Sequence, residues 1–540
     1  MLRRLAITLL LFGALRAQEM RVQVLSTTDV HGHVMAEDTF SMQPRNLGWA
    51  KLATLIRQRK ALNPNTILVD SGDTIQGEPI NYVRHRLRRD LPDPSMPIMN
   101  DLGYAAMAVG NHEFDFGLEV LREVEKQAKF PWICANAVNA KDAQPAFKPF
   151  VKVKVGEVTV GILGLVTPQI PKWSEPASYE GLTFEDIVAS AKVWVPRLRE
   201  KEKVDVVLVA VHSGLGEVAG QPGDENAVLR LADQVAGIDA ILSGHTHRPI
   251  VTRHKGVPIL QAHMHGLALG VLELVLRKDK ARWTLVSAEP SLLRPADDTP
   301  VDPTVLALTT ELREGTRTYL DTFATNLQVD VDTRFARMED SPVLELLHRS
   351  MREATGAQLT AAACFNTGLY IPKGPTSVRQ WYAILPYENK LARIRVTGRQ
   401  LKAYLEHAAR YYNPPYMPEL ASGQLAGYDF DMVQGVSYAL DLMKPVGQRV
   451  VNLRWQGQPV NPDQTFTLGL TSYRLRGGGG YMEAMGWNGA PEVVTEECHR
   501  NLLLDMILKN PTLTMTPDHN WRTIPYLDRE RVMQAQAGGR

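Results

Sequence analysis

The stretch Val22-Gln-Val-Leu-Ser-Thr-Thr-Asp-Val-His31 begins as a largely apolar run and ends in two side chains that bind metals well. The same pattern returns along the first half of the chain, where other short apolar runs stop at polar strings. These strings are Ser71-Gly72-Asp73, Gly110-Asn111-His112-Glu113, Val211-His212-Ser213 and Gly244-His245-Thr246-His247. Near-continuous apolar runs bounded by turn residues predict short strands that are buried on both faces. Because the carboxyl ends of strands in an open α/β sheet meet at one crevice, we expect the strings to converge there.

The donor side chains in these strings offer oxygen or imidazole nitrogen, and none is a cysteine. A single string could be an ordinary turn after a strand, but several with the same chemistry and placement favour a common metal site. The candidate ligands are Asp29, His31, Asp73, Asn111, His212, His245 and His247. A shared carboxylate can hold two divalent cations about 3.5–4 Å apart, which is typical of hydrolases. Mixed oxygen and nitrogen ligation suits Mn, Zn, Co, Ni or Fe and disfavours Ca.

The ordered strings resemble those of the calcineurin-type metallophosphoesterases, in the branch of bacterial 5′-nucleotidases and 2′,3′-cyclic-nucleotide 2′-phosphodiesterases/3′-nucleotidases. The resemblance implies an α/β fold with an N-terminal layered αββα sandwich, joined by a helix to a C-terminal α/β domain of the 5′-nucleotidase type. It also implies hydrolysis of nucleotide phosphoesters by a hydroxide that bridges two divalent ions, with Asp73 shared between them. The resemblance also implies that Asp29, His31 and His247 bind one ion, and that Asn111, His212 and His245 bind the other.

By the same resemblance, His112 faces the phosphoryl oxygens and protonates the departing alkoxide, while Asp115 orients its ring. A carboxylate that holds an imidazole favours its cationic form, as general acid catalysis requires. Asp115 could instead cap the following helix, and the two roles are compatible. Glu113 is expected to make supporting hydrogen bonds rather than to take part in the chemistry.

The second half of the chain resembles the C-terminal domain of the same family at Phe365-Asn-Thr-Gly368, Pro386-Tyr-Glu-Asn389 and Ser472-Tyr-Arg474. The resemblance assigns Phe430 and Tyr473 to a sandwich around the nucleobase and Asn366 to the phosphate side. Either Arg334 or Arg337 is expected to supply a cationic contact to phosphate. For each of the two aromatic rings, a place in the hydrophobic core is the alternative.

Two positions depart from the 5′-nucleotidase pattern. Ile371 stands where that pattern has a phosphate-binding Arg, and Gly479 stands where it has an Asp for the ribose hydroxyls. The strings around Asp73, Tyr387 and Tyr473 look more like the branch that opens 2′,3′-cyclic nucleotides and cleaves 3′-nucleotides. The sequence therefore leaves the position of the phosphate on the ribose open. The alternative function keeps the same metal site but acts on another substrate, such as a UDP-sugar or a thiosulfate ester. A non-catalytic binding protein is disfavoured because every ligand position is filled.

A length of 540 residues predicts more than one domain. Arg3 and Arg4, followed by an apolar stretch, indicate a signal peptide over residues 1–17, so we expect a periplasmic or secreted protein. The metal-bearing domain is predicted over residues 18–295. A linker helix is predicted over residues 296–327, with its start marked by Asp302-Pro303. The substrate-binding domain is predicted over residues 328–530.

Charge, hydropathy and cysteine content limit the partners. The formal net charge is only +1, which argues against nucleic-acid duplexes as substrates and leaves a small-molecule nucleotide as the expected partner. No segment after the expected signal peptide approaches transmembrane length, so we expect no stable membrane anchor. Cys134, Cys364 and Cys498 are compatible with one disulfide or with free thiols.

Overall fold

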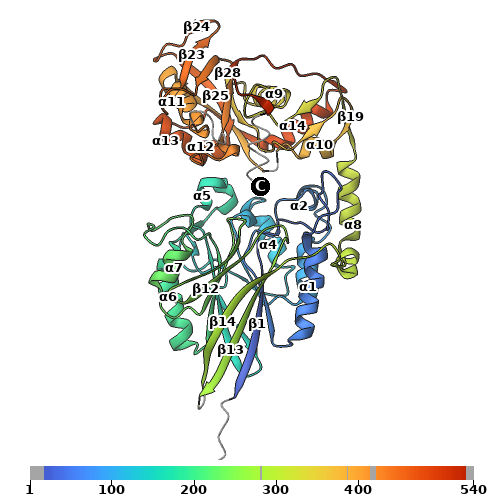
Figure 1. The fold of residues 1–540 in the computed structure, drawn as a ribbon, viewed down its shortest axis with the longest axis vertical. Helices are drawn as coiled ribbons and strands as arrows, with labels where there is room; N and C mark the ends of the chain where they lie inside the picture. Colours follow the sequence, from blue (N-terminus) through green and yellow to red (C-terminus); the bar gives the residue numbers. More distant parts are fainter. Residues whose placement is uncertain (1–17, 280–281, 386, 414–420, 531–540) are drawn as a thin grey trace, which may run out of the picture.

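The computed structural model describes residues 18–279, 282–385, 387–413 and 421–530, so the expected signal peptide lies outside the described residues. The chain forms two domains stacked along the long axis of the molecule (Figure 1). Helix α8 (Pro303–Leu320) runs along one side, where the first domain meets the second. This arrangement confirms the predicted two-domain α/β architecture.

Two six-stranded sheets form the N-terminal domain. The first has the order β14-β13-β1-β2-β3-β4, with bounds Arg282–Leu293, Leu269–Asp279, Glu19–Thr27, Thr66–Asp70, Ala106–Ala108 and Trp132–Ile133. The second has the order β11-β12-β10-β9-β7-β6, with bounds Pro249–His254, Val257–Ala262, Ala240–Ser243, Val206–His212, Val158–Val166 and Phe150–Val155. The central strands β1, β2, β3 and β4 are parallel to one another, as are β7, β9, β10 and β12. The carboxyl ends within each parallel set therefore lie along one edge.

The strand side chains alternate between two separate cores, because successive residues point to opposite faces. In β9, Val206 and Leu208 pack between the two sheets, while Val207 and Val209 pack on the side of α6 (Ile187–Pro196) and α7 (Val228–Gln234). The outer side of the first sheet is covered by α1 (Gly48–Leu62), α3 (Ser95–Leu102) and α4 (Leu118–Glu125). Burial on both faces explains the near-continuous apolar runs. The layer order confirms the predicted αββα sandwich (Figure 1).

Shorter elements carry the loops above the sheets. Strand β5 (Ala137–Asn139) pairs with β8 (Leu182–Phe184), and the remaining short helices are α2 (Pro79–Tyr82) and α5 (Ile170–Trp173). Figure 1 shows both short helices at the end of the N-terminal domain that meets the C-terminal domain.

The C-terminal domain is built on a mixed five-stranded sheet. Its order is β21-β17-β25-β20-β26, with bounds Asp431–Gln434, Leu359–Ala363, Thr465–Thr471, Lys390–Thr397 and Val493–Cys498. A four-stranded sheet has the order β24-β23-β22-β28, with bounds Gln458–Pro459, Val450–Trp455, Ser437–Asp441 and Trp521–Ile524. The helices are α9 (Pro342–Thr355), α10 (Val378–Tyr382), α11 (Gly398–Ala408), α12 (Ser472–Leu475), α13 (Tyr481–Met485) and α14 (His499–Leu508). The minor strands are β15 (Phe323–Leu327), β16 (Val331–Asp332), β18 (Tyr370–Ile371), β19 (Gly374–Ser377) and β27 (Thr512–Leu513).

The connecting helix α8 starts where its sequence predicts and ends earlier than expected. The Asp302 carboxylate accepts hydrogen bonds from the N–H groups of Thr304 and Val305, and it also pairs with Arg57 of α1. The predicted helix continued to about residue 327, but α8 stops at Leu320. The chain beyond it, Phe323–Leu327, forms strand β15, which pairs with β19 and β27. Strand pairing within the C-terminal domain therefore overrides the local helical pattern.

All three cysteines are free and buried, so the structure favours the free-thiol alternative. Within the described part of the chain, no helix combines the length and the apolar composition needed to cross a membrane.

Candidate metal centre and substrate pocket

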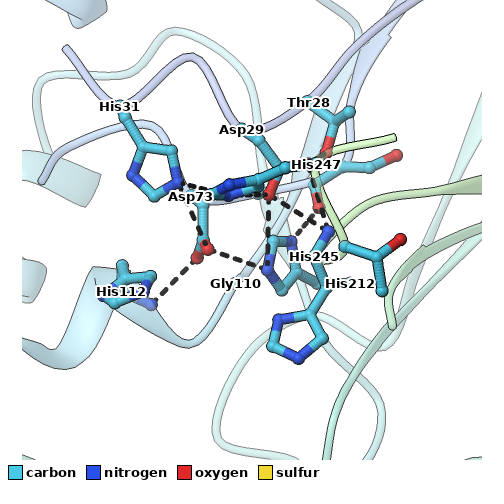
Figure 2. A network of polar contacts seen from close by, with 12 residues as sticks. Thr28, Asp29, His31, Asp73, Gly110, His112, His212, His245 and His247 are labelled. Carbon is cyan, nitrogen blue, oxygen red and sulfur yellow. Dashed lines mark hydrogen bonds and ion pairs between the residues drawn. The ribbon is translucent and has the colours of Figure 1, made fainter. Parts of the chain in front are cut away.

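The candidate metal ligands lie at or just beyond the carboxyl ends of parallel strands in both sheets. They are Asp29 and His31 after β1, Asp73 after β2, Asn111 after β3, His212 at the end of β9, and His245 and His247 after β10. Figure 2 shows the labelled aspartates and histidines of this set clustered around one centre. The structure thus brings together the residues that the sequence strings predicted would converge.

Two groups of donor atoms share the carboxylate of Asp73. One donor atom from each of Asp29, His31, Asp73 and His247 lies within 4.8 Å of the others, and the same holds for Asp73, His212 and His245. Asp29, Asp73 and His212 are almost completely buried. Two donor groups with a carboxylate in common form a dimetal-type site.

Hydrogen bonds determine which ring nitrogen of His31 faces this centre. His31 Nδ1 lies 2.7 Å from the carbonyl oxygen of Gln76. Because a carbonyl oxygen only accepts, Nδ1 carries the hydrogen, and Nε2 presents a lone pair in the neutral ring. His31 Nε2 lies 3.0 Å from Nε2 of His247. The two ring nitrogens thus lie close enough together to bind one cation.

His212 is arranged in the same way on the other side of Asp73. Its Nδ1 lies 2.7 Å from the carbonyl oxygen of Ser71, and its Nε2 lies 2.9 Å from Asp73 Oδ2. Asn111 Oδ1 is buried and has no hydrogen-bond partner among the described residues, and the contact to His212 is the shortest one that Asp73 Oδ2 makes. Buried acceptors without partners are unfavourable, whereas divalent cations match these oxygen and nitrogen donors. The residues therefore fit a pair of divalent ions, and the orphaned Asn111 oxygen supports its inclusion.

The ligand loops adopt a backbone conformation that side chains other than glycine rarely take. The φ angles are 52° at Asp29, 51° at His31, 58° at Asp73, 79° at His245 and 56° at His247. Such positive φ values are unfavourable for residues with a Cβ and persist only where the surroundings impose them. Five strained residues in one cluster indicate that the loops are shaped to aim their side chains.

The carboxylate of Glu113 ties two of these loops together. Glu113 is fully buried and accepts hydrogen bonds from the N–H groups of Asp73, Thr74 and Ile75 in one loop and of Gly110 in the other. Burial and the neighbouring Asp73 charge raise the pKa of Glu113 to about 7, and the N–H groups of Thr74 and Asp73 oppose that rise. A Cβ on Gly110 would lie 2.2 Å from Asp73 Oδ1, so glycine is required at this approach. These contacts support the expected structural part for Glu113.

His112 lies beside the metal centre with a carboxylate at its back. Its Nδ1 is 2.7 Å from Asp115 Oδ2, and its backbone N–H donates to Asp73 Oδ1. Burial alone would lower the pKa of His112, but the carboxylates of Asp115 and Asp73 outweigh burial and raise it to about 10. A cation held by Asp73 would cancel part of this effect and leave Asp115 as the main partner. The ring of Tyr387 lies nearly parallel to that of His112, with the centroids 6.4 Å apart.

A pocket of about 830 Å³ opens over the metal centre between the two domains. The N-terminal domain contributes, among others, Asn111, His112, Asp115, Trp173, Glu175, Glu225, His245, His247 and Arg248. The C-terminal domain contributes, among others, Phe365, Tyr387, Glu388, Tyr428 and Tyr473. A ligand in this pocket can contact the metal centre and the second domain at the same time.

The pocket corrects one of the two predicted stacking residues. Tyr473 lines the pocket as expected, but Phe430 does not. Phe430 is 1% exposed, and its ring stacks on Tyr411 with the centroids 4.9 Å apart, so it belongs to the core. Tyr428, two residues earlier, is 49% exposed and lines the pocket. Because the chain forms a turn at Gly427–Asp429 before β21, the side chains of Tyr428 and Phe430 point in different directions.

The predicted phosphate-side residues are not among the residues that line the pocket. Asn366 is exposed in the turn after β17, where its Oδ1 accepts a hydrogen bond from the N–H of Gly368. The Arg337 guanidinium donates to the carbonyl oxygens of Cys364 and Phe365. Arg337 therefore holds the backbone of the turn that carries Phe365, and its expected contact to phosphate stays a prediction. Arg334 is exposed and pairs with Asp332.

Several pocket residues were not singled out by the sequence reasoning. Tyr387 belongs to a string already noted for its family resemblance, so that string was a usable signal. Glu225 lies 2.8 Å from Nε2 of His245, which leaves Nδ1 of that ring for the metal centre, and Trp173 packs 5.4 Å from the same ring. Glu225 lies in an irregular segment and Trp173 ends the short helix α5, and no periodicity or motif marks either residue.

The shared carboxylate makes a specific prediction about metal content. Asp73→Ala removes the only donor common to both groups, so we expect bound divalent metal to fall from about two ions per chain to well under one. Metal analysis after equilibration with Mn or Zn and gel filtration measures this directly. Asp115→Ala is the matched control, because Asp115 contacts His112 rather than either donor group, and it should retain the parent metal content. A parent protein holding fewer than one ion per chain under these conditions would contradict the dimetal assignment.

Comparison with protein-family models divides the chain in two. A calcineurin-like phosphoesterase model matches residues 22–249, and a model of the 5′-nucleotidase C-terminal domain matches residues 322–485. The first match contains every residue of both donor groups. The second contains Tyr428 and Tyr473.

Named relatives span nearly the whole chain. The trifunctional nucleotide phosphoesterase protein YfkN of Bacillus subtilis is 28% identical over 94% of this chain, which spans only 39% of YfkN. A 2′,3′-cyclic-nucleotide 2′-phosphodiesterase/3′-nucleotidase of Haemophilus influenzae is 28% identical over 95% of this chain and 88% of its own length.

Solved structures agree with these matches. A Staphylococcus aureus protein provisionally assigned as a 5′-nucleotidase superposes with a TM-score of 0.82, at 25% identity over 93% of this chain and 100% of its own. A solved calcineurin-like phosphoesterase portion of YfkN is 31% identical, with a TM-score of 0.53, over 56% of this chain and 99% of its own. The chain therefore belongs to the calcineurin-like metallophosphoesterases whose metal-bearing domain is followed by a 5′-nucleotidase C-terminal domain.

Proposed function

We propose that this protein hydrolyses nucleotide phosphoesters, with 2′,3′-cyclic nucleotides and 3′-nucleotides as its preferred substrates. One observation carries the proposal: a single pocket has a dimetal-type donor set in one domain and two tyrosines, Tyr428 and Tyr473, in the other. A nucleotide matches this arrangement, because its phosphoryl group can contact the cations and its flat base can stack on the aromatic rings.

The metal-binding residues are proposed to act as two sets. Asp29, His31, Asp73 and His247 would hold one divalent cation, and Asp73, Asn111, His212 and His245 the other. Mn, Zn, Co, Ni or Fe is compatible with these mixed donors. When bound, the cations make water more acidic and neutralise charge on the phosphoryl oxygens.

His112 is proposed to protonate the leaving oxygen. Asp115 holds its Nδ1, so Nε2 is the nitrogen available to a substrate in the pocket that His112 lines. The same carboxylate favours the cationic ring, which is the form able to donate a proton. Tyr387 next to the ring limits its movement and contributes to the pocket wall.

The charge of the pocket favours substrates that carry their negative charge at the metals alone. Away from the metal centre, Asp115, Glu175, Glu225 and Glu388 are acidic lining residues, and Arg248 is the one Arg or Lys among the described lining residues. Each of these carboxylates is already paired, in order with His112, Arg476, His245 and Arg500, so Arg248 is the one Arg or Lys of the lining that a second phosphate, as in UDP-sugars, could contact. A cyclic diester, with a single negative charge, suits this pocket better. The Haemophilus influenzae relative, named for the 2′,3′-cyclic activity, supports the same choice.

The proposal places this activity outside the cytoplasm, in the scavenging of nucleotides. The expected signal peptide over residues 1–17 is its support, and cell fractionation with N-terminal sequencing of the mature protein tests it. Mature protein that retains residue 1 would argue for another compartment.

A substrate panel tests the proposed function. With Mn or Co added, we expect kcat/KM to be higher for 2′,3′-cyclic AMP and 3′-AMP than for AMP and UDP-glucose, and we expect chelator to abolish all activity. A nitrophenyl phosphodiester serves as a substrate without a base. Preference for UDP-glucose, or turnover of a thiosulfate ester in place of nucleotides, would overturn the substrate assignment while leaving the metal assignment intact.

Proton donation by His112 predicts a dependence on the leaving group. His112→Ala should keep both metals but lose roughly 10²–10⁴-fold in kcat on 3′-AMP, the usual scale for a general acid. Nitrophenolate needs little protonation, so its release should suffer less. Equal losses for both substrates would indicate that His112 stabilises the phosphoryl oxygens instead. Metal analysis of the variant separates either effect from loss of metal.

The two pocket tyrosines predict a selective loss of nucleotide recognition. Tyr428→Ala and Tyr473→Ala should each weaken nucleotides by about 1–3 kcal/mol, seen as a KM raised roughly ten-fold, because stacking contributes on that scale. The nitrophenyl diester, which has no base, should change much less. Phe430→Leu is the contrasting variant, because Phe430 lies in the core: it should lower the melting temperature and leave the substrate preference unchanged. A Phe430→Leu variant that loses nucleotide preference would restore Phe430 to the pocket.

A further inference from the structure

The residue after Tyr473 is a buried arginine whose donors are all used. Arg474 is 2% exposed. Its Nε and Nη2 donate to the two oxygens of Asp431, each at 2.9 Å, and Nη1 donates to Asp429 Oδ1 at 2.5 Å. Nη2 also donates to the carbonyl oxygen of Tyr428 at 3.0 Å, and Nη1 makes a longer contact of 3.5 Å to that of Gly478. These contacts match the five N–H groups of a guanidinium in number.

The acceptors of Arg474 belong to the segment that carries the other pocket tyrosine. Tyr428 and Asp429 form the turn before β21, and Asp431 begins that strand. Arg474 instead lies in α12, directly after β25. Strands β21 and β25 are not neighbours in the sheet, because β17 lies between them. No backbone ladder therefore connects the two tyrosines directly, and the Arg474 side chain spans the gap.

A second layer of contacts fixes the acceptors. The hydroxyl of Tyr404 donates to Asp431 Oδ2, and the hydroxyl of Tyr481 donates to the carbonyl oxygen of Asp429. Arg474 also lies over the rings of Tyr473 and Tyr481, at 5.0 and 4.9 Å from the ring centroids. The cluster is thus rigid around the guanidinium and faces Tyr473 directly.

Four consecutive glycines follow Arg476, and two of them, Gly478 and Gly479, pack against the same cluster. A Cβ at Gly478 would lie 2.5 Å from the ring of Tyr473, and one at Gly479 would lie 3.0 Å from Arg474 Nη1 and from Asp429 Oδ1. This close approach explains the absence of side chains at these two positions. The turn supports Tyr473 and Arg474, so its glycines need no phosphate ligand to account for them.

The chemistry of this cluster is better suited to fixing the orientation of the groups around Arg474 than to stabilising the fold. A buried ion pair is often no more stabilising than apolar residues of the same volume. A planar guanidinium with a full set of acceptors, by contrast, fixes the positions of its partners in a way that a lysine ammonium does not. Here the partners are the two segments that present rings to the pocket.

We propose that Arg474 is a positioning residue for the nucleobase: by bonding at once to Tyr428, Asp429 and Asp431 beside its own neighbour Tyr473, it sets the separation of the two pocket tyrosines. This inference rests on the proposed function, because it assumes that a base enters between those rings. Arg474 touches no substrate itself. Its effect is expected in substrate binding rather than in the chemical step.

Arg474→Lys tests the proposal, because it keeps the charge and removes the planar fork. We expect KM for 2′,3′-cyclic AMP to rise roughly ten-fold, similar to the loss of one stacking partner, with kcat changed much less. The loss in kcat/KM on the nucleotide should exceed the loss on the nitrophenyl diester by about the same factor. In a Tyr473→Ala background the Arg474→Lys change should add little, since one ring of the pair is already missing.

Matched variants separate this effect from a general cost of altering a buried arginine. Arg449 is also fully buried in the C-terminal domain, but it donates to the carbonyl oxygens of Lys444, Ala409 and Tyr412, away from the pocket. Arg449→Lys should lower the melting temperature without changing the ratio of nucleotide to diester activity. Asp429→Asn keeps the volume and weakens one acceptor, so it should shift that ratio in the same direction but less than Arg474→Lys, even if the latter folds poorly.

The outcomes distinguish the inference from the function on which it rests. A parent enzyme that shows no preference for base-bearing esters over the nitrophenyl diester contradicts the proposed function. A parent with that preference, and Arg474→Lys and Asp429→Asn variants that lose activity equally on both substrates, contradicts the inference and leaves Arg474 with a purely structural role.

Discussion

The whole metal centre depends on one constraint: loops from different strands must be held close together although they bring the buried carboxylates of Asp29, Asp73 and Glu113 into one place. The Glu113 carboxylate satisfies this constraint by accepting four backbone N–H groups from two loops. Because these four hydrogen bonds involve backbone N–H groups, they leave the side chains of Asp73 and Asn111 available to coordinate a cation. A buried anion beside Asp73 is unfavourable unless positive charge balances it. The same contacts that build the centre therefore also create its demand for cations.

Strain in the loops follows from the same requirement. Five ligand residues have positive φ, each at a cost of order 1–3 kcal/mol. The loops alone could not hold these conformations, since they would relax to ordinary turns. They sit at the ends of strands buried on both faces, and the cores on either side of the sheets fix where each strand ends. The layered architecture thus supports conformations that are useful only when metals are bound.

The convergence of the candidate metal ligands could be predicted from the sequence because each ligand lies in a short, local string. Each ligand string follows an apolar run, and the rule that parallel strands end at one edge was enough to bring the strings together. The second domain behaves differently. Tyr428 and Phe430 are two residues apart and would share a face of a regular strand, so alternation could not choose between them. Because the chain forms a turn before β21, the ring of Tyr428 points into the pocket and the ring of Phe430 points into the core. The backbone contacts of Arg337 could not be predicted either, because its acceptors are carbonyl oxygens 27 and 28 residues away, which no motif reveals.

This difference reflects how the two halves of the site are built. The metal centre draws its ligands from strand ends, so strand pairing alone fixes their spacing, and one sequence string suffices for each ligand. The two pocket tyrosines, Tyr428 and Tyr473, lie in the turn before β21 and in α12 after β25, and these two strands are not neighbours because β17 lies between them. The spacing of the two tyrosines must come from side chains, and a guanidinium that reaches two carboxylates is suited to that task because its plane fixes direction as well as distance. Backbone topology therefore sets the positions of the metal ligands, whereas under the proposed function a buried polar cluster sets the recognition of a base, and we expect substitutions there to change recognition without disturbing the metal ligands.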